Sequence, residues 1–351
     1  MIRANTLNVL LTNWCNAECS HCCMNAGPRR SDSLAEEDVR KIVGELHRHN
    51  RLKVVVFAGG EPTARRNTLR HALRFCSSLG IRTRMVTNAY WARNERSAKK
   101  LLQDLRADGL NELNISCDDY HQAYIPIANV INAWQASKGL GFGAVIIANG
   151  TGPNNVINPG YLAAQLGEAI PVRSIHDKPL RLSRTPKRDG TYFGISYSTF
   201  QRLERAAENV PEPIFVDVED PSLLEGGCPH VIRNAALSPK GRLLACCGFE
   251  FPPGHPLDLG DARAEDCGRI IERANGHDFV AALAFLGPYF LLKVVAAVAP
   301  DLVRPQRFGS VCEICRTLTT DPEKMRVVQQ TSECWLPALR EVQAKRKAMA
   351  A

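Results

Sequence analysis

Short, mainly apolar runs alternate with amphipathic segments over roughly the first 190 residues of the chain. Residues 7–11 (LNVLL) and 54–57 (VVVF) are typical of strands buried in a parallel sheet. Between them, residues 33–49 repeat apolar positions at helical spacing. Ser33, with Glu36 three residues later, is the expected N-cap of that helix. The pattern predicts a strand–helix–strand unit.

The same alternation continues downstream. Further helices are expected at residues 69–79, 98–107, 130–138 and 161–170. Further strands are expected at residues 82–88, 110–119, 143–148 and near 179–182. Repeated strand–helix units predict an α/β fold, in which crossover helices join the strands of a parallel sheet.

Residues suited to a binding site stand at the ends of these predicted strands. A cysteine-rich loop follows the first strand, and later strand ends carry Gly59 to Glu61, Asn88, Ser116 and Asp118. In parallel sheets, sites form where the carboxyl ends of the strands meet. We therefore expect these residues to converge on one rim of a barrel or curved sheet.

The pattern changes after Gly190. Residues 198–209 are expected to form a helix, and residues 210–222 (VPEPIFVDVEDPS) have the prolines and acids of an interdomain connection. From Cys228 onward the chain is rich in cysteine and in loops, which predicts a small metal-stabilised second domain. Residues 336–351 are expected to form a basic helix or tail.

One apolar run, residues 279–299, is long enough to suggest a membrane span. Gly287 and Pro288 interrupt it, and Lys293 lies in its second half, so two short buried helices are expected instead. The first residues lack the apolar core and cleavage site of a signal peptide. We expect a cytoplasmic protein without a membrane segment. Thirteen cysteines then point to metal binding or catalysis rather than disulfides.

The charge adds little to this picture. The 44 Lys and Arg against 36 Asp and Glu give a net charge of +8 that is spread along the chain. No dense basic block with interleaved aromatic residues is present in the sequence, so nucleic-acid binding is not expected.

Cys15, Cys19 and Cys22 form the spacing C-x3-C-x2-C. A structural zinc site usually has four nitrogen or sulfur ligands, commonly in C-x2-C pairs. Three thiolates in one tight loop suit a cubane iron–sulfur cluster with one iron left open. The spacing favours the cluster, with zinc as the alternative.

With GGEP after the second strand, this cysteine motif resembles the radical S-adenosylmethionine superfamily. The resemblance implies a partial (β/α)6 TIM-like barrel and a [4Fe–4S] cluster on Cys15, Cys19 and Cys22. It also implies that S-adenosylmethionine binds the open iron. Its reductive cleavage would give a 5′-deoxyadenosyl radical that abstracts a hydrogen atom from substrate.

The resemblance extends to single residues. Gly59, Gly60, Glu61 and Pro62 match the GGEP motif, which implies contacts with the amino group of the methionine portion. The glycines would allow close approach of the backbone.

Asn88 follows Thr87 as in relatives, although Ala89 replaces their glycine. Ser116, Asp118 and His121 resemble a Ser-x-Asp motif, which implies contacts with the ribose or the methionine portion. Arg184 stands where relatives often carry an arginine for the carboxylate, and His21 stands where an aromatic residue packs near adenine. These are the remaining residues that the resemblance implies in cofactor binding.

The second cysteine group resembles the SPASM and shorter twitch extensions of this superfamily. Cys228 is followed by twelve residues, a glycine, four residues and Cys246, and Cys312 and Cys315 follow downstream. The resemblance implies one auxiliary [4Fe–4S] cluster on these four cysteines, with a zinc site as the alternative. Cys247 could replace Cys246, and Cys334 is a fifth candidate.

Other cysteines are expected to serve packing. Cys117 should point away from the site if Ser116 and Asp118 point into it. Cys76 and Cys267 are expected in the core. Cys23, beside a ligand cysteine, is either a packing residue or a thiol hydrogen-atom donor, and packing is the expected role.

These inferences divide the chain into four parts. Residues 1–195 are the expected barrel, 196–226 a linker and helix, 227–335 the auxiliary-cluster domain and 336–351 the tail. The predicted function is oxidation, crosslinking or epimerisation of a ribosomally made peptide, with electrons from a flavodoxin- or ferredoxin-type donor.

The first strand begins too early for an N-terminal leader-binding domain, so a peptide would need a separate recognition protein or another surface. Two alternatives stay open: the same chemistry on a small natural-product precursor, and a non-catalytic iron–sulfur redox sensor.

Overall fold

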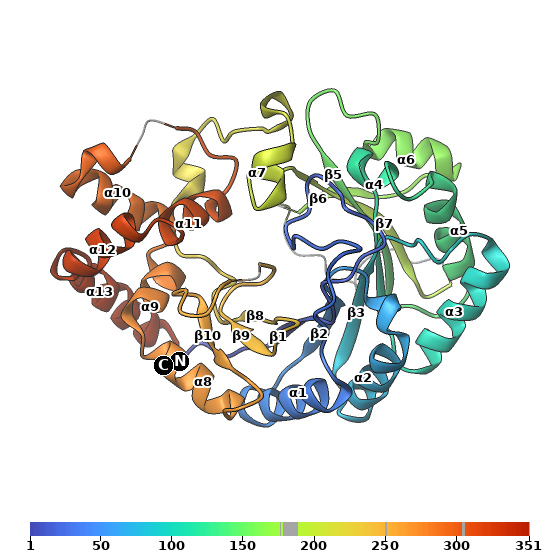
Figure 1. The fold of residues 1–351 in the computed structure, drawn as a ribbon, viewed down its shortest axis with the longest axis horizontal. Coiled ribbons are helices and arrows are strands. Elements are labelled where there is room, and N and C mark those ends of the chain that lie inside the picture. Colours follow the sequence, from blue (N-terminus) through green and yellow to red (C-terminus); the bar gives the residue numbers. More distant parts are fainter. Residues whose placement is uncertain (176, 178–188, 250, 304–305, 351) are drawn as a thin grey trace.

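The computed structural model describes residues 1–175, 177, 189–249, 251–303 and 306–350. One ten-stranded sheet, in the order β10-β9-β8-β1-β2-β3-β4-β5-β7-β6, curves through the molecule (Figure 1). The strands from the first half of the chain are β1 (Thr6–Leu10), β2 (Val54–Ala58), β3 (Arg82–Thr87), β4 (Glu112–Ser116) and β5 (Ala144–Thr151). These five strands pair in parallel, as the alternation predicts.

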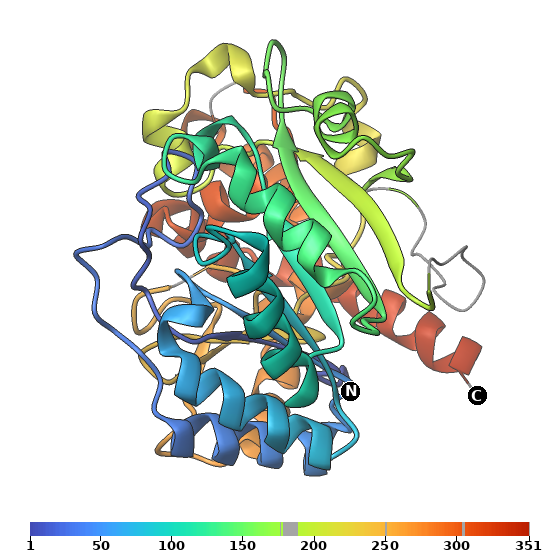
Figure 2. The same ribbon diagram turned by 90° about the vertical axis from the view of Figure 1, so that its right-hand side faces the viewer.

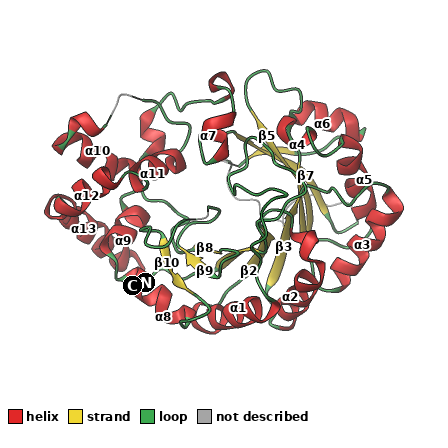
Figure 3. Cartoon of the chain, in the orientation of Figure 1, coloured by secondary structure: helices red, strands yellow, loops and turns green. Residues whose placement is uncertain are grey.

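Helices lie outside the strands (Figure 3) and cover one face of the sheet (Figure 2). They are α1 (Glu36–Asn50), α2 (Arg66–Ser78), α3 (Glu95–Ala107), α5 (Ile127–Ser137) and α6 (Pro159–Leu166), with the short η1 (Pro62–Arg65) and α4 (Asp119–Gln122) at strand ends. The N-cap of α1 is Ala35 rather than the expected Ser33. The Ser33 hydroxyl instead lies 2.8 Å from that of Thr12, so it ties the cysteine loop to the chain that enters α1.

The chain around residue 198 differs from the prediction. Residues expected to start a helix belong to β7 (Tyr192–Thr199), and only α7 (Arg205–Asn209) is helical. The sequence YFGISYST is rich in aromatic and β-branched residues, which favour strands. β7 pairs in parallel with β5 and with the edge strand β6 (Val172–Ser174). The strand expected near residues 179–182 lies outside the described residues.

The sheet continues into the second half of the chain. β8 (Asn234–Leu237) pairs in parallel with β1, and β9 (Arg242–Leu244) and β10 (Asp258–Asp261) extend it antiparallel. The residues after Cys228 therefore share both a sheet and a continuous apolar core with the first half.

The remaining helices gather beyond β10 (Figure 1). They are α8 (Cys267–Asn275), α9 (Asp278–Phe285), α10 (Pro288–Val298), α11 (Val311–Thr319), α12 (Pro322–Gln330) and α13 (Ser332–Ala350), with the short η5 (Pro300–Leu302). The short η3 (Glu212–Ile214) and η4 (Pro221–Leu224) follow α7 instead. The apolar run forms two helices, α9 and α10, bent by 111°, as predicted. α9 is largely buried, whereas α10 is buried along one side only. Among the described residues, no single helix is long and apolar enough to cross a bilayer, although this bent pair has the length and composition.

Candidate functional site

The loop between β1 and α1 brings three thiols to one cavity at the carboxyl end of the sheet. This cavity of about 360 Å³ is lined by Cys15, Cys19 and Cys22. Residues from the ends of three further strands share its lining: Gly59, Gly60, Thr87, Asn88, Ser116 and His121. The structure thus brings these strand-end residues together on one rim.

Backbone hydrogen bonds hold the cysteine loop in place. The Cys15 N–H donates to the Gly27 carbonyl at 3.2 Å, and the Cys22 N–H donates to the Cys19 carbonyl at 3.1 Å. Burial, with a smaller contribution from the nearby Cys22 thiol, raises the pKa of Cys15 and of Cys19 to about 12. Three thiols aimed into one cavity fit the donor set of an iron–sulfur cluster, whose binding would release their protons.

Gly59 and Gly60 allow close packing of two backbone segments. A Cβ at Gly60 would lie 2.0 Å from the Trp14 carbonyl oxygen, and a Cβ at Gly59 would lie 2.6 Å from the Thr12 oxygen. Gly59 also has φ of 120°, in the region that favours glycine. The Gly60 N–H donates to the Thr12 carbonyl at 2.6 Å. In this structure the space left by the missing side chains is filled by the backbone of the cysteine loop.

Glu61 is fully buried behind the cavity wall. Its carboxylate accepts from the Thr63 N–H and hydroxyl at 3.1 and 2.6 Å, from the Thr87 hydroxyl at 3.0 Å and from the Asn88 N–H at 3.0 Å. Burial raises the pKa of Glu61, and these hydrogen bonds oppose the rise. Glu61 and the buried Pro62 do not line the cavity. Glu61 therefore joins the ends of β2 and β3 beneath the site.

Asn88 reaches the cysteine loop directly. Its side-chain amide donates to the Asn16 side-chain oxygen at 3.0 Å and lies 3.6 Å from the Cys15 sulfur. Ala89, where relatives were expected to carry glycine, has φ of 61°, so a non-glycine residue occupies the left-handed region here. The end of β3 thus contacts a predicted cluster ligand.

Asp118 joins the end of β4 to the cysteine loop. One carboxylate oxygen lies 2.8 Å from His121 Nδ1 and 3.1 Å from His21 Nε2. Burial raises the pKa of the Asp118 carboxyl, but the charge and hydrogen bonds of His121 and His21 outweigh it and hold that pKa below its usual range. Asp118 and His21, both predicted to bind the cofactor, therefore contact each other in this structure.

His21 belongs to an aromatic cluster beside the cavity. Its ring stacks on Tyr120 with centroids 5.2 Å apart, and Phe200 lies edge-on at 5.4 Å. Its Nδ1 atom is buried without a hydrogen-bond partner. Tyr120 and Phe200 were not anticipated from the sequence, because no motif marks them.

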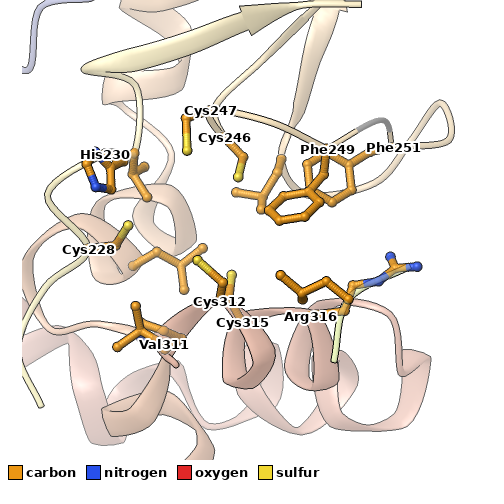
Figure 4. Close-up of a pocket in the computed structure, with 15 residues that line it drawn as sticks. Cys228, His230, Cys246, Cys247, Phe249, Phe251, Val311, Cys312, Cys315 and Arg316 are labelled. Atoms are coloured by element: carbon orange, nitrogen blue, oxygen red, sulfur yellow. The ribbon is translucent and has the colours of Figure 1, made fainter. Parts of the chain in front are cut away.

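A second cavity holds five thiols from three segments of the chain (Figure 4). The residues are Cys228, Cys246, Cys247, Cys312 and Cys315. They are free thiols whose sulfur atoms face a common space (Figure 4). The donor set therefore fits an iron–sulfur cluster or a zinc ion by its chemistry.

The fold explains why these cysteines meet. Gly227, before Cys228, packs so closely on α9 that a Cβ would lie 2.2 Å from the Ala284 carbonyl oxygen. Gly241, the glycine of the C-x12-G-x4-C motif, turns the β8–β9 hairpin with φ of 77°. Cys246 follows β9, and α11 presents its two cysteines from one helical turn.

Cys246 and Cys247 are not equivalent. Their mutual hydrogen bond and burial raise the pKa of Cys246, and the same hydrogen bond lowers the pKa of Cys247 to about 7. Cys247 lines both cavities, whereas Cys246 lines only the second. Cys334 is exposed and lines neither. Arg184 lies outside the described residues.

Cys76, Cys117 and Cys267 are buried away from both cavities, as expected. Cys23 is different. It is exposed, and it lines the first cavity and two neighbouring cavities of about 470 and 320 Å³. Cys23 is therefore not a core residue, and both of its expected roles, packing and hydrogen-atom donation, stay predictions.

Residues 9–139 match the Radical SAM superfamily. Over 332 residues, the chain is 21% identical to YydG of Bacillus subtilis, a protein named for peptide biosynthesis, with 91% of this chain and 93% of that protein covered. It is also similar to a GTP 3′,8-cyclase of Gloeobacter violaceus, 32% identical over 124 residues that cover 34% of this chain and 36% of the relative.

Among solved structures, anSMEcpe with bound AdoMet and Cp18Cys peptide is similar, with a TM-score of 0.51, 12% identity, and coverage of 97% of this chain and 99% of that one. This likeness confirms the α/β fold with its mostly parallel sheet. Residues 9–139, which contain the three cysteines and the GGEP motif, form a radical SAM domain. The matched family therefore covers the part of the chain that carries the first cysteine site.

Proposed function

We propose that this enzyme modifies a ribosomally made peptide by abstracting a hydrogen atom, and that it holds a second iron–sulfur cluster. The observation that carries the proposal is the pair of thiol-lined cavities, which share Cys247 in their walls. A chain that only cleaved S-adenosylmethionine would not need five further thiols in a second cavity.

Cys15, Cys19 and Cys22 hold the first [4Fe–4S] cluster in this proposal. When bound, the cluster and S-adenosylmethionine supply the 5′-deoxyadenosyl radical that takes the hydrogen atom. The chain itself positions the reactants: Asn88 and Ser116 present polar side chains to the cavity, and Asp118 holds His21 beside it. The aromatic cluster around His21 offers a flat surface for adenine.

The auxiliary [4Fe–4S] cluster takes Cys228, Cys246, Cys312 and Cys315 as ligands. Cys246 is chosen over Cys247 because Cys246 lines only the second cavity, whereas Cys247 also lines the first. A cluster with four protein ligands can accept or pass on an electron but has no open iron for substrate. This favours net oxidation or crosslinking of a substrate radical, while Cys247 stays free at the first cavity.

A peptide is the preferred substrate for two reasons. The similar protein YydG is named for peptide biosynthesis, and the similar structure of anSMEcpe contains a bound peptide. In addition, two further cavities adjoin the first at Cys23, so an extended chain would have room on either side of the reacting atom.

The test begins with anaerobic reconstitution with iron and sulfide, followed by a reductant and S-adenosylmethionine. We expect 5′-deoxyadenosine, and its absence would contradict the radical chemistry. Short peptides encoded beside this gene are then added, and their mass and solvent-deuterium content are measured. Loss of hydrogen indicates oxidation or crosslinking, and deuterium uptake alone indicates epimerisation. Turnover of a small molecule but of no such peptide would favour the alternative substrate class.

A further inference from the structure

Arg205, the first residue of α7, clamps the cysteine loop from outside. Its guanidinium donates to the Cys19 carbonyl at 3.0 Å and to the Ala26 carbonyl at 2.7 Å. One cation thus ties both ends of the segment that carries two of the three predicted cluster ligands.

Glu204, the residue before it, faces both cysteine sites. One carboxylate oxygen accepts from the Asn25 side-chain amide at 3.0 Å, and the other lies 2.9 Å from an Arg316 guanidinium nitrogen. Arg316 follows Cys315 and lines the second cavity (Figure 4). The Glu204 side chain is only 9% exposed. Two consecutive residues therefore contact the loop of the first cluster and the helix of the second.

The backbone at Glu204 indicates that this arrangement is under constraint. Its φ of 47° and ψ of −126° lie where residues other than glycine are strained. Glycine would relieve the strain, but it would remove the carboxylate that contacts Asn25 and Arg316. A strained non-glycine residue at such a position points to a role for its side chain.

We propose that Glu204 and Arg205 are positioning residues that hold the two cluster sites in register, and that Arg205 raises the reduction potential of the first cluster. A [4Fe–4S] cluster with three thiolate ligands gains negative charge on reduction, so a nearby guanidinium stabilises the reduced form more than the oxidised form. The Glu204 half of this inference rests on the proposed second cluster, whereas the Arg205 half does not.

Arg205→Gln tests the charge and Arg205→Lys tests the geometry. The reconstituted proteins are titrated with a reductant, and electron paramagnetic resonance follows the reduced first cluster. At a fixed solution potential, we expect Arg205→Gln to lower the ratio of reduced to oxidised first cluster about tenfold. This corresponds to a reduction potential lower by about 59 mV for one electron. Arg205→Lys should keep the wild-type potential but lose iron faster to a chelator. Arg326→Gln removes an exposed cation on α12 and should change neither.

An Arg205→Gln protein with the wild-type potential would overturn the role of the charge, even if its iron content fell. If Arg205→Gln holds no iron, the potential of Arg205→Lys is measured instead. Lysine keeps the charge, so a clearly lowered potential in this variant would also overturn the role of the charge.

Glu204→Gln tests the other half. Without the carboxylate, Arg316 is no longer neutralised, so the potential of the second cluster should rise while that of the first stays unchanged. Two unchanged potentials would overturn the role of Glu204. Iron for one cluster only in the wild-type protein would instead refute the proposed second cluster and leave the Arg205 result standing.

Discussion

At the scale of single residues, Glu61 shows how a motif residue serves the fold beneath the site. Its buried carboxylate accepts hydrogen bonds from four donors on three residues. In Glu61→Gln, an amide N–H₂ replaces one acceptor and faces these donors. We expect the free energy of unfolding to fall by about 2 kcal/mol, as for other unsatisfied buried groups. Urea denaturation under anaerobic conditions measures this change.

Glu37→Gln is the matched control, because Glu37 is exposed on α1. Its stability should remain within about 0.5 kcal/mol of wild type. Equal stability of the two variants would show that the Glu61 carboxylate is not needed by the fold.

The His121–Asp118 pair should make stability depend on pH. Burial lowers the pKa of His121, but the charge and hydrogen bond of Asp118 outweigh it, so this pKa is raised. A raised histidine pKa gives stability that is complete below the unfolded value of about 6.5 and is lost as pH rises through the folded value. His121→Gln should therefore cost more at about pH 6 than at about pH 9, by an amount on the order of 1 kcal/mol.

Urea midpoints of the apo-protein at the two pH values measure the difference, and the exposed His277→Gln is the control. A cost of His121→Gln that does not change with pH would mean that the histidine stays neutral in the folded protein.

The site residues found from the sequence lie close together along the chain, whereas those missed lie far from the loop that they contact. Cys15, Cys19 and Cys22 stand within eight residues, and their spacing alone predicts a common ligand. Glu204 and Arg205 reach the same loop from about 180 residues away. No local spacing encodes such a contact, so only the folded chain reveals it.

At the scale of elements, Gly60 tests whether the contact between the end of β2 and the cysteine loop is required. In Gly60→Ala, the new Cβ would lie 2.0 Å from the rigid Trp14 carbonyl, so the loop must move. We expect a loss of about 3 kcal/mol or more, together with poor iron uptake on reconstitution. Gly276→Ala has only an ordinary contact at 3.5 Å and should behave as wild type. Normal iron uptake by Gly60→Ala would show that the loop tolerates this shift.

The strand–helix alternation predicted the elements from β1 to β5 because each buried strand is a short apolar run. The same reasoning missed the pairing of β8 with β1, in which Thr6 lies opposite Asn234. β8 is only four residues long, and pairing between strands so far apart in sequence leaves no periodic signal.

At the scale of the whole molecule, the iron content decides whether the chain holds two separate clusters. We expect about eight irons per chain after reconstitution and about four when Cys15, Cys19 and Cys22 are all replaced by serine. Cys228→Ser with Cys312→Ser should also leave about four, because the two cavities use different ligands. The first cluster should survive in that double variant, and S-adenosylmethionine should still be cleaved without substrate.

Cys334→Ser is the matched control for a thiol outside both cavities and should keep the full iron content. Zinc in place of iron at the second cavity would keep the five thiols but abolish the electron-accepting role. Loss of both clusters in the Cys228 and Cys312 double variant would mean that the sites fold together, which the shared sheet and continuous core make a real physical alternative. A circular dichroism melt of the same variant separates the two cases, because a local loss of ligands leaves the melting of the sheet near that of wild type.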